Sequence, residues 1–553
     1  MLQFDGSIAA CIVKFGCRSN NYKLPLVLFF FVGLCYTGTT LFAKSGINDH
    51  VDGAVIAQQI IVDADLWNGG LSGTTGWGVY NAPQSYDPGF GGLFFPSIEK
   101  DWTQENYPNG SATGVSQSRS IYSNVEAYRQ AVALGQDASR FQSAATAGAD
   151  YLLSNNFSDS TFGGFYWGND FTGSNPSADR KNSYGQVHPV FALTHTYSIT
   201  NDSTYLDGAL SGFDAYYSHM HEGANTGGGF EGAYLGSADR DWSNASSRNL
   251  DVMTHTFETL DELYHQLPDG HARKAEFRDK AVDAGNHIMA SMFQQMQGVG
   301  NEDKGFIPWH NDAQWDPVLT DPDPTKWWGN EWRFSSPGHN FEYAFLFSRA
   351  VERGLVTGAI ADEWLAKSEK LMNYALEFSF GDVGNISADP DSKYMGVLYD
   401  RLDFGMGFDE GAVIIQEDSS GNPLPIQTLN WWPQAEAARS LAHWAEIRGK
   451  DEWWDEFDGV FALILDKLID QAVGGWYYNL DPDSLFPLNK RGIADTDKGS
   501  PWKANYHATM MYTELSELAE MSAVPIPPAF YLFSSVLIGF WFSGWRRRIA
   551  LAS

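Results

Sequence analysis

The chain has 553 residues and a formal net charge of −32, and 43% of its residues are apolar. This apolar share is enough for a large buried core. The acidic balance argues against nucleic acid and anionic membranes as partners of the body, and it suits neutral partners such as sugars or solvation in a saline medium.

The first 43 residues are expected to form an export segment. They hold all three cysteines of the chain: Cys11, Cys17 and Cys35. Lys23 precedes an apolar run over 24–35, and small and polar residues follow as far as Ala43. This order predicts a secretory signal, with an uncleaved membrane anchor as the alternative. Removal of the segment would leave a protein without disulfides or thiolate metal ligands.

A glycine followed by aromatic or apolar residues recurs six times along the body. The six segments are 91–95, 163–167, 228–230, 305–309, 396–399 and 474–478. Between them the apolar residues recur with a helical period, in pairs separated by a short polar break, as in 127–134 and 141–153. The sequence therefore predicts an all-α (α/α)6 barrel with short β-hairpins in its loops. A two-domain helical solenoid is the alternative, and the count of six favours the closed ring.

In such a ring the inner helices run parallel, so their first turns and free N–H groups meet at one mouth. Position early in an inner helix is therefore the test for a candidate site residue. The residues that pass it are Arg119, His255, His339, Glu342, Trp432, Glu436 and His507.

The positions of four histidines in their helices bear on what each of them does. His339 and Glu342 share one helix face, so that Glu342 can bond one ring nitrogen and leave the other as a proton acceptor. His443 lies about three turns into its helix and is interpreted as structural. His188 lies near a helix start and its role stays open, whereas His195 is expected to be a satisfied core or interface histidine.

The end of the chain resembles the sorting tails that exosortases recognise, the PEP-CTERM type. A Val-Pro-x-Pro turn begins at Val524, an apolar run extends from Ala529 to Trp545, and three arginines follow from Arg546. The resemblance implies an exported body, in the periplasm, at the cell surface or outside the cell, and an exosortase-like processing enzyme as a partner. A permanent tail anchor is the alternative. Membrane contact is expected through the terminal segments only.

The expected division of the chain therefore has three parts. These are a signal or anchor segment over 1–43, a catalytic barrel over 44–522, and a sorting tail over 523–553.

Five motifs of the body resemble, in order, those of the N-acylglucosamine 2-epimerase superfamily, which includes cellobiose 2-epimerases and mannose isomerases. The motifs are Arg119 with Tyr122, Asp-Val-Met-Thr-His-Thr-Phe-Glu at 251–258, Pro-Gly-His-Asn-Phe-Glu at 337–342, the stretch at 431–436 that begins Trp-Trp-Pro, and Trp-Lys-Ala-Asn-Tyr-His at 502–507. The resemblance spans approximately residues 60 to 518. Its fold is an (α/α)6 barrel, which agrees with the count of six segments.

The resemblance implies a role for each matched residue. His339 and His507 would be the acid/base pair, and Glu342 would orient His339. Arg119 would stabilise an oxyanion, and His255 would help to open and bind the sugar ring. The implied substrate-binding residues are Trp432, Trp502, Tyr122, Glu258 and Glu436, the two tryptophans as platforms for a sugar ring.

Three positions depart from the family pattern and leave the substrate open. Asp251 stands where relatives commonly have Asn, and Asn430 stands where a basic residue is frequent. Gln186 stands where the disaccharide epimerases tend to have His.

The expected function is that of an exported sugar 2-epimerase or aldose–ketose isomerase. It would move the C2 proton of a reducing mono- or oligosaccharide through an enediolate, with two histidines and without a metal or nucleotide cofactor. No His and carboxylate spacing of a recognised metal site and no phosphate loop is present. One alternative is a glycoside or unsaturated-uronide hydrolase, which needs two carboxylates across the pocket. The other is a non-catalytic carbohydrate-binding matrix protein.

Overall fold

The computed structural model describes residues 45–523, with gaps. The gaps are 70–73, 76–77, 80–85, 88–91, 97, 101, 103–110, 171–179, 224–229, 322–332, 385–392, 400, 409–410, 414–415, 418–422, 425–427, 489–496 and 501. The expected export segment and sorting tail lie outside the described residues, as do Gly91, Gly228 and Gly229. Within the described part, no helix has both the length and the apolar character that crossing a membrane requires.

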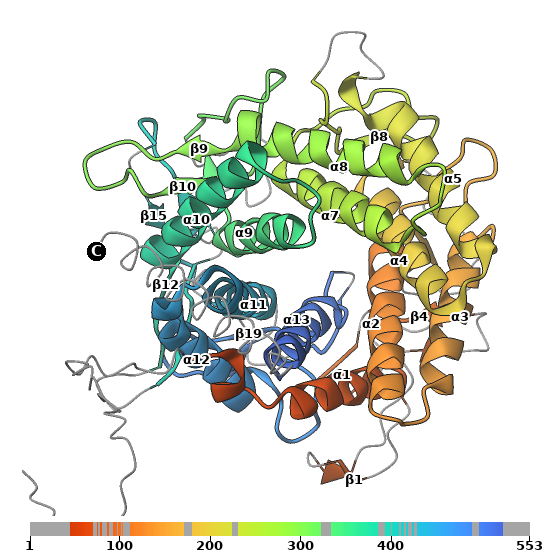
Figure 1. Ribbon diagram of the computed structural model, residues 1–553, viewed down its shortest axis with the longest axis horizontal. Helices are drawn as coiled ribbons and strands as arrows, with labels where there is room; N and C mark the ends of the chain where they lie inside the picture. Colours follow the sequence, from red (N-terminus) through yellow and green to blue (C-terminus); the bar gives the residue numbers. More distant parts are fainter. Residues whose placement is uncertain are drawn as a thin grey trace, which may run out of the picture. The chain divides into compact units, whose positions relative to one another are not determined.

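Two concentric rings of helices form the body (Figure 1). The inner helices are α2 (Gly114–Ala133), α4 (Tyr184–Thr200), α7 (Leu250–Gln266), α9 (Pro337–Glu352), α11 (Trp431–Arg448) and α13 (Tyr506–Ala523). The outer helices are α1 (Gly53–Trp67), α3 (Ser139–Leu153), α5 (Ser203–Met220), α8 (Lys274–His287), α10 (Ala359–Ser379) and α12 (Trp454–Leu463). Each inner helix contacts the next, and α13 contacts α2. The described residues thus confirm the (α/α)6 barrel.

Local sequence sets where these helices begin. The Asn249 side chain accepts a hydrogen bond from the backbone N–H of Val252 and so caps α7. Pro337 is the first residue of α9, where its missing N–H costs no helical hydrogen bond. Both helices therefore begin at fixed residues, which positions the side chains of their first turns.

Aromatic side chains hold the two rings together. Phe257 of α7 and Phe347 of α9 stack with ring centroids 4.6 Å apart, and Trp364 of α10 packs edge-on against both. Trp364 is 1% exposed. Burial of such large rings is the main stabilising term for the core between the layers.

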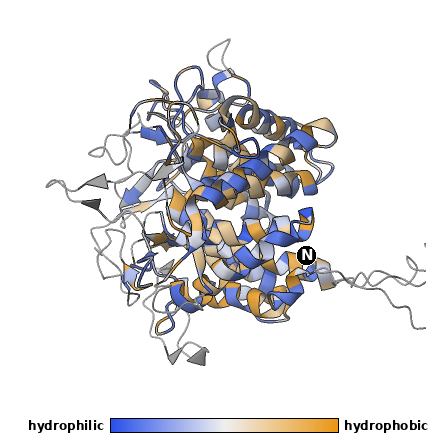
Figure 2. Cartoon of the chain, turned by 90° about the vertical axis from the view of Figure 1, so that its left-hand side faces the viewer, coloured by the Kyte–Doolittle hydropathy of each residue, from blue (hydrophilic) through white to orange (hydrophobic). Residues whose placement is uncertain are grey.

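The connections differ at the two ends of the barrel. An inner helix passes to its outer partner through a short link, such as 201–202 between α4 and α5, whereas the returns to the next inner helix are long and carry the short strands. These longer connections gather at one end of the barrel (Figure 2, left). The N-terminal turns of the inner helices open at that same end, so the loops surround the mouth.

All strand pairs are antiparallel and short. The pairs are β1 (Thr74–Thr75) with β2 (Gly78–Val79), β3 (Tyr86–Asp87) with β4 (Leu93–Phe94), β5 (Ser111–Thr113) with β6 (Gly168–Asp170), β7 (Arg180–Asn182) with β8 (Ser237–Asp239), β9 (Gln294–Gln295) with β10 (Gly305–Phe306), β12 (Phe380–Asp382) with β13 (Met395–Val397), and β16 (Gln416–Glu417) with β17 (Pro423–Leu424). Two sheets have three strands, β11 (Phe334–Ser335), β14 (Leu402–Asp403) and β15 (Ala412–Val413), and β18 (Leu429–Asn430), β19 (Asn479–Leu480) and β20 (Pro487–Leu488). Single-turn helices occupy Ile47–Asp49, Ile288–Met292, Asp451–Trp453 and Ile464–Leu468.

The glycine-aromatic segments follow outer helices and are held by amide side chains at the start of the next inner helix. Gln186 of α4 accepts from the N–H of Phe165 and donates to its carbonyl, and Gln434 of α11 does the same with Val397. Gln117 of α2 bonds the 92–94 segment in a similar way. Gln186 is therefore a structural residue, so its difference from the disaccharide epimerases says nothing about the substrate.

Candidate active site

Two buried histidines face each other across an indole at the mouth. The Trp432 ring lies 4.6 Å from the His339 ring and 5.7 Å from the His507 ring, measured between centroids. Gly338 makes room for this indole, since a Cβ there would lie 2.5 Å from the Trp432 ring. The structure thus brings together three predicted residues from α9, α11 and α13.

His507 is a neutral imidazole with one open nitrogen. Its Nδ1 lies 2.7 Å from Glu436 Oε1, and Glu436 also accepts from Arg439 Nε at 2.6 Å. Burial, together with the positive charges of Arg119 and Arg439, holds the pKa of His507 well below its usual value. Nε2 has no hydrogen-bond partner among the described residues, so it can accept a proton.

His339 is held by partners other than the expected one. Its Nδ1 lies 2.9 Å from Ser336 Oγ, and its Nε2 lies 2.6 Å from Asp251 Oδ1. Glu342 makes no hydrogen bond to His339, so the expectation that Glu342 orients this ring is wrong. The His339 ring reaches across the interface between helices towards Asp251 of α7, which satisfies it without the carboxyl one turn further along α9.

A second group of polar side chains lies beside this pair. His255 Nδ1 bonds Glu258 Oε2 at 3.0 Å, and the Tyr506 hydroxyl donates to the same oxygen at 2.6 Å. His188 lies 4.7 Å from His255 and stacks on Tyr184. Burial, and then the neighbouring His255, lowers the pKa of His188 well below its usual value. The sequence alone assigns no role to His188. The structure places its ring beside His255, within the site.

Glu342 stands next to this second group with no hydrogen bond. Neither of its carboxyl oxygens has a partner among the described residues, and its side chain is fully buried. Burial, reinforced by the nearby Glu436 and Glu258, raises the pKa of Glu342 well above its usual value. Burial therefore favours the protonated form of the Glu342 carboxyl.

The described residues contain one set with metal-like spacing, which the sequence did not indicate. Ligand atoms of His255, Glu258 and Glu342 all lie within 4.8 Å of one another. A metal requires deprotonated ligands. The raised pKa of Glu342 and the existing bond between His255 and Glu258 make this a poor fit for a cation.

Arg119 lies beside His507 with its guanidinium over the ring of Tyr506, at 4.8 Å. One of its terminal nitrogens donates to the backbone carbonyl of Trp502 at 2.5 Å, while its Nε has no partner in the described part of the chain. Trp502 itself is 46% exposed and packs near Trp167. The Trp502 indole is thus open to a ligand, as expected for a sugar platform.

A cavity of about 490 Å³ opens at the mouth. Its walls combine aromatic rings with hydroxyl, amide and charged groups, and they include Tyr184, Ser237, Asn249, Asp251, Trp309 and Trp502. The volume falls in the range of small-molecule sites. Flat aromatic faces and many hydrogen-bonding groups suit a neutral polyol.

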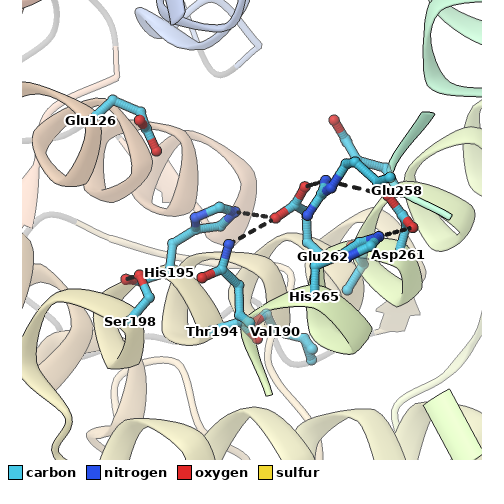
Figure 3. Close-up of polar contacts among 12 residues, drawn as sticks. Glu126, Val190, Thr194, His195, Ser198, Glu258, Asp261, Glu262 and His265 are labelled. Atoms are coloured by element: carbon cyan, nitrogen blue, oxygen red, sulfur yellow. Dashed lines mark hydrogen bonds and ion pairs between the residues drawn. The ribbon is translucent and has the colours of Figure 1, made fainter. Parts of the chain in front are cut away.

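A second cavity, of about 350 Å³, lies among the C-terminal halves of the inner helices. It is lined by Tyr122, His195 and Glu262 among others. Figure 3 shows His195 and Glu262 pointing toward each other from neighbouring helices. The structure thus places Tyr122, expected to bind substrate, at this rear cavity. Burial lowers the pKa of His195 to about 3, and neither ring nitrogen has a hydrogen bond, although Nε2 lies 3.5 Å from Glu262. The expectation of a satisfied His195 is therefore wrong.

His443 is structural, as expected. It is fully buried, and its two ring nitrogens lie 2.8 Å from Ser348 Oγ and 2.8 Å from Glu514 Oε1. Both nitrogens are occupied by protein groups far along the inner helices, so His443 has no part in the mouth.

The (α/α)6 barrel and the buried histidines at its mouth define the class of this protein as a helical-barrel enzyme. Comparison with known proteins places the chain within this class. Residues 101–387 and 392–493 match the N-acylglucosamine 2-epimerase (GlcNAc 2-epimerase) family. The chain belongs to this family and is a sugar epimerase or isomerase.

The relatives support this assignment. The cellobiose 2-epimerase of Ruminococcus albus is 23% identical over 376 residues, which cover 66% of this chain and 78% of that protein. The cellobiose 2-epimerase of Bacteroides fragilis is 21% identical over 414 residues, 74% of this chain and 89% of that protein.

Two solved structures share the fold. The cellobiose 2-epimerase from Spirochaeta thermophila superposes with a TM-score of 0.62 at 18% identity and covers 88% of this chain and 100% of its own. A D-mannose isomerase superposes with a TM-score of 0.60 at 19% identity and covers 84% of this chain and 97% of its own.

Proposed function

We propose that the protein moves the C2 proton of a reducing mono- or oligosaccharide, with His339 and His507 on opposite faces of the substrate. Return of the proton to C2 on the other face gives the epimer, and return to C1 gives the ketose. No group other than these side chains is needed to carry the proton.

One observation carries the proposal: several buried polar atoms of the mouth, around His255, Glu258 and Tyr506, have no hydrogen-bond partner among the described residues. They are Arg119 Nε, His188 Nε2 and both carboxyl oxygens of Glu342. Buried polar atoms in folded proteins almost always have partners, so a cluster without them indicates the place of a polar ligand. Several hydroxyl groups of a sugar would satisfy such a cluster.

Each side chain has a task in this chemistry. His507, neutral and with Nε2 open, accepts the C2 proton. Arg119 donates from Nε to the oxygen on which negative charge develops, and its guanidinium stays protonated throughout. His255, bonded to Glu258, and the neutral His188 lie where they can assist the opening of the sugar ring.

The hydrolase alternative is weaker because the carboxylates of the mouth are engaged elsewhere. Glu258 holds His255 and Tyr506, and Glu436 holds His507 and Arg439. Glycoside hydrolysis needs one carboxylic acid and one free carboxylate across the bond to be cleaved. Among the described residues Glu342 offers the first, but the Asp251 carboxylate that lines the mouth is held against His339 at 2.6 Å.

We also propose that the body acts outside the cytoplasm and that an exosortase-like enzyme processes its tail. The apolar run before Ala43, and the proline turn, apolar run and arginines from Val524 onward, support this proposal. Fractionation of cells that produce the chain with and without residues 524–553 tests it. Body found in the cytoplasm in both cases would refute export.

The test of the activity is incubation with a panel of reducing sugars in deuterated water, followed by NMR. We expect deuterium at C2 together with an epimer or a ketose. His339→Ala and His507→Ala should each lower product formation by about 100-fold or more, because each removes one of the two proton carriers. His219→Ala, at an exposed histidine stacked on Trp242, is the matched control. Glycosidic cleavage without exchange, or full activity in either variant, would refute the proposal.

A further inference from the structure

The two histidines that flank Trp432 have different partners at the nitrogens that face the site. His507 is held only at Nδ1, by Glu436, and its Nε2 is open. His339 is engaged at both nitrogens, by Ser336 and by Asp251. Asp251 Oδ1 lies at ion-pair distance from His339 Nε2, 2.6 Å, and has no hydrogen bond among the described residues. Because a carboxylate is an acceptor only, so close an approach requires a proton on Nε2.

We propose that Asp251 is a positioning residue that holds the Nε2 proton of His339. It also connects that proton with water in the cavity of about 490 Å³ at the mouth. The inference rests on the proposed function, because it assigns Asp251 a task within the C2 proton transfer. Asp251 does not itself meet the reacting carbon. It acts through the ring that it orients.

Asp251 contacts both the His339 ring and the cavity at the mouth. It is the second residue of α7, and its side chain is 22% exposed, so that one face of the carboxylate meets His339 and another lines the cavity of about 490 Å³. A proton lost from His339 in one turnover can therefore be restored through Asp251 from cavity water. His339 itself is only 6% exposed and lacks such access.

The charged groups around the pair favour an ionised Asp251. Burial alone would raise the pKa of its carboxyl, but the His339 imidazole, with help from His255 and Tyr184, holds that pKa below its usual value. On its other sides the His339 ring meets the indoles of Trp309 and Trp432, and the Glu436 carboxyl of α11 interacts with it electrostatically. Asp251 thus stays negative over the neutral range.

Asp251→Asn tests the proposal, because it keeps the shape and removes the charge. We expect kcat to fall about 10- to 100-fold, as for loss of a hydrogen bond to a charged group. The basic limb of the pH profile of kcat should move to lower pH by about one unit, since the carboxylate no longer favours the protonated ring. Asp251→Glu, which restores the charge, should return the limb towards its wild-type position.

Two further variants separate this role from general loosening of the site. Asp241→Asn removes the same charge at an exposed loop carboxylate that bonds Ser243, and it should leave kcat and the pH profile unchanged. Ser336→Ala frees Nδ1 of His339 and should lower kcat without moving the limb. A limb that stays in place in Asp251→Asn, or that moves as far in Ser336→Ala, would overturn the proposal.

The role of Asp251 can also be tested without any turnover, and so independently of the proposed function. ¹⁵N NMR of the imidazoles reports the His339 Nε2 proton in the free protein without turnover. We expect an Nε2–H signal for His339 in the wild type and its loss in Asp251→Asn. Absence of C2 exchange in the wild type would refute the proposed function, whereas identical His339 signals in both proteins would refute the role of Asp251 alone.

Discussion

Three histidines of the mouth each lie against a carboxylate that comes from a different place in the chain. His255 uses Glu258 on its own helix, His507 uses Glu436 from α11, and His339 uses Asp251 from α7. Helical spacing alone can identify only the first of these pairs. The other two depend on which helices are neighbours in the ring.

Glu342 leads to a prediction about stability and pH. Its folded pKa lies well above the usual 4.5, so the folded protein keeps a proton that the unfolded chain releases. Wild-type stability should therefore fall as the pH rises above about 4.5, by up to about 1.4 kcal/mol per pH unit from this group. Glu342→Gln mimics the neutral acid and should remove this loss.

Chemical denaturation between pH 5 and 8 measures the difference in unfolding free energy between Glu342→Gln and the wild type. We expect the variant to gain relative stability as the pH rises. Glu452→Gln, at an exposed position, is the control for the loss of one carboxylate. A difference that stays constant over this range would show that Glu342 is ionised in the folded protein.

At the scale of elements, amide side chains fix the return of the chain from the outer ring to the inner ring. Gln186 occupies both the N–H and the carbonyl of Phe165, and Gly164 lets it approach, because a Cβ at that glycine would lie 2.5 Å from Gln186 Oε1. The starts of α2, α4 and α11 depend on contacts of this kind.

Gln186→Leu should lower the unfolding free energy by about 2–4 kcal/mol, because it leaves two buried backbone groups unpaired. Thermal unfolding measures the loss. Gln136→Leu, at an exposed amide that bonds only Gln58, is the control and should change stability little. If Gln186→Leu had the melting temperature of the wild type, the Gln186 amide would not be what holds the backbone of Phe165.

At the scale of the molecule, the ring closes within residues 45–523. Helix α13 contacts α11, α2 and α1, so the last inner helix completes both the barrel and, through His507, the site. The long connections lie at the mouth, where they can vary in sequence without changing the contacts between helices. The fold thus separates the scaffold from the surface that selects the substrate.

A chain trimmed to residues 45–523 should keep the melting temperature and the specific activity of the full chain. A chain trimmed to 45–505 lacks α13 and should not fold, because α1, α2 and α11 would lose their shared partner. Circular dichroism and the C2 exchange assay measure both properties. Loss of folding in the longer fragment would show that the terminal segments contribute to the barrel.

The sequence by itself determined the fold class, the mouth and most of the side chains there. Six glycine-aromatic segments and paired helical periods are local patterns, and position early in an inner helix selected Arg119, His255, His339 and His507. Those four residues do lie together, because parallel helices in a ring place equal positions at equal depth.

Only the tertiary structure decided which groups act on those residues. It showed that His339 lies against Asp251 and Ser336, that Glu342 makes no hydrogen bond among the described residues, that His188 lies in the site, and that Gln186 holds the backbone of Phe165. Hydrogen bonds and pKa shifts depend on distances of a few ångströms between residues far apart in the chain. Such distances are set by the packing of one helix against the next, which no local pattern encodes.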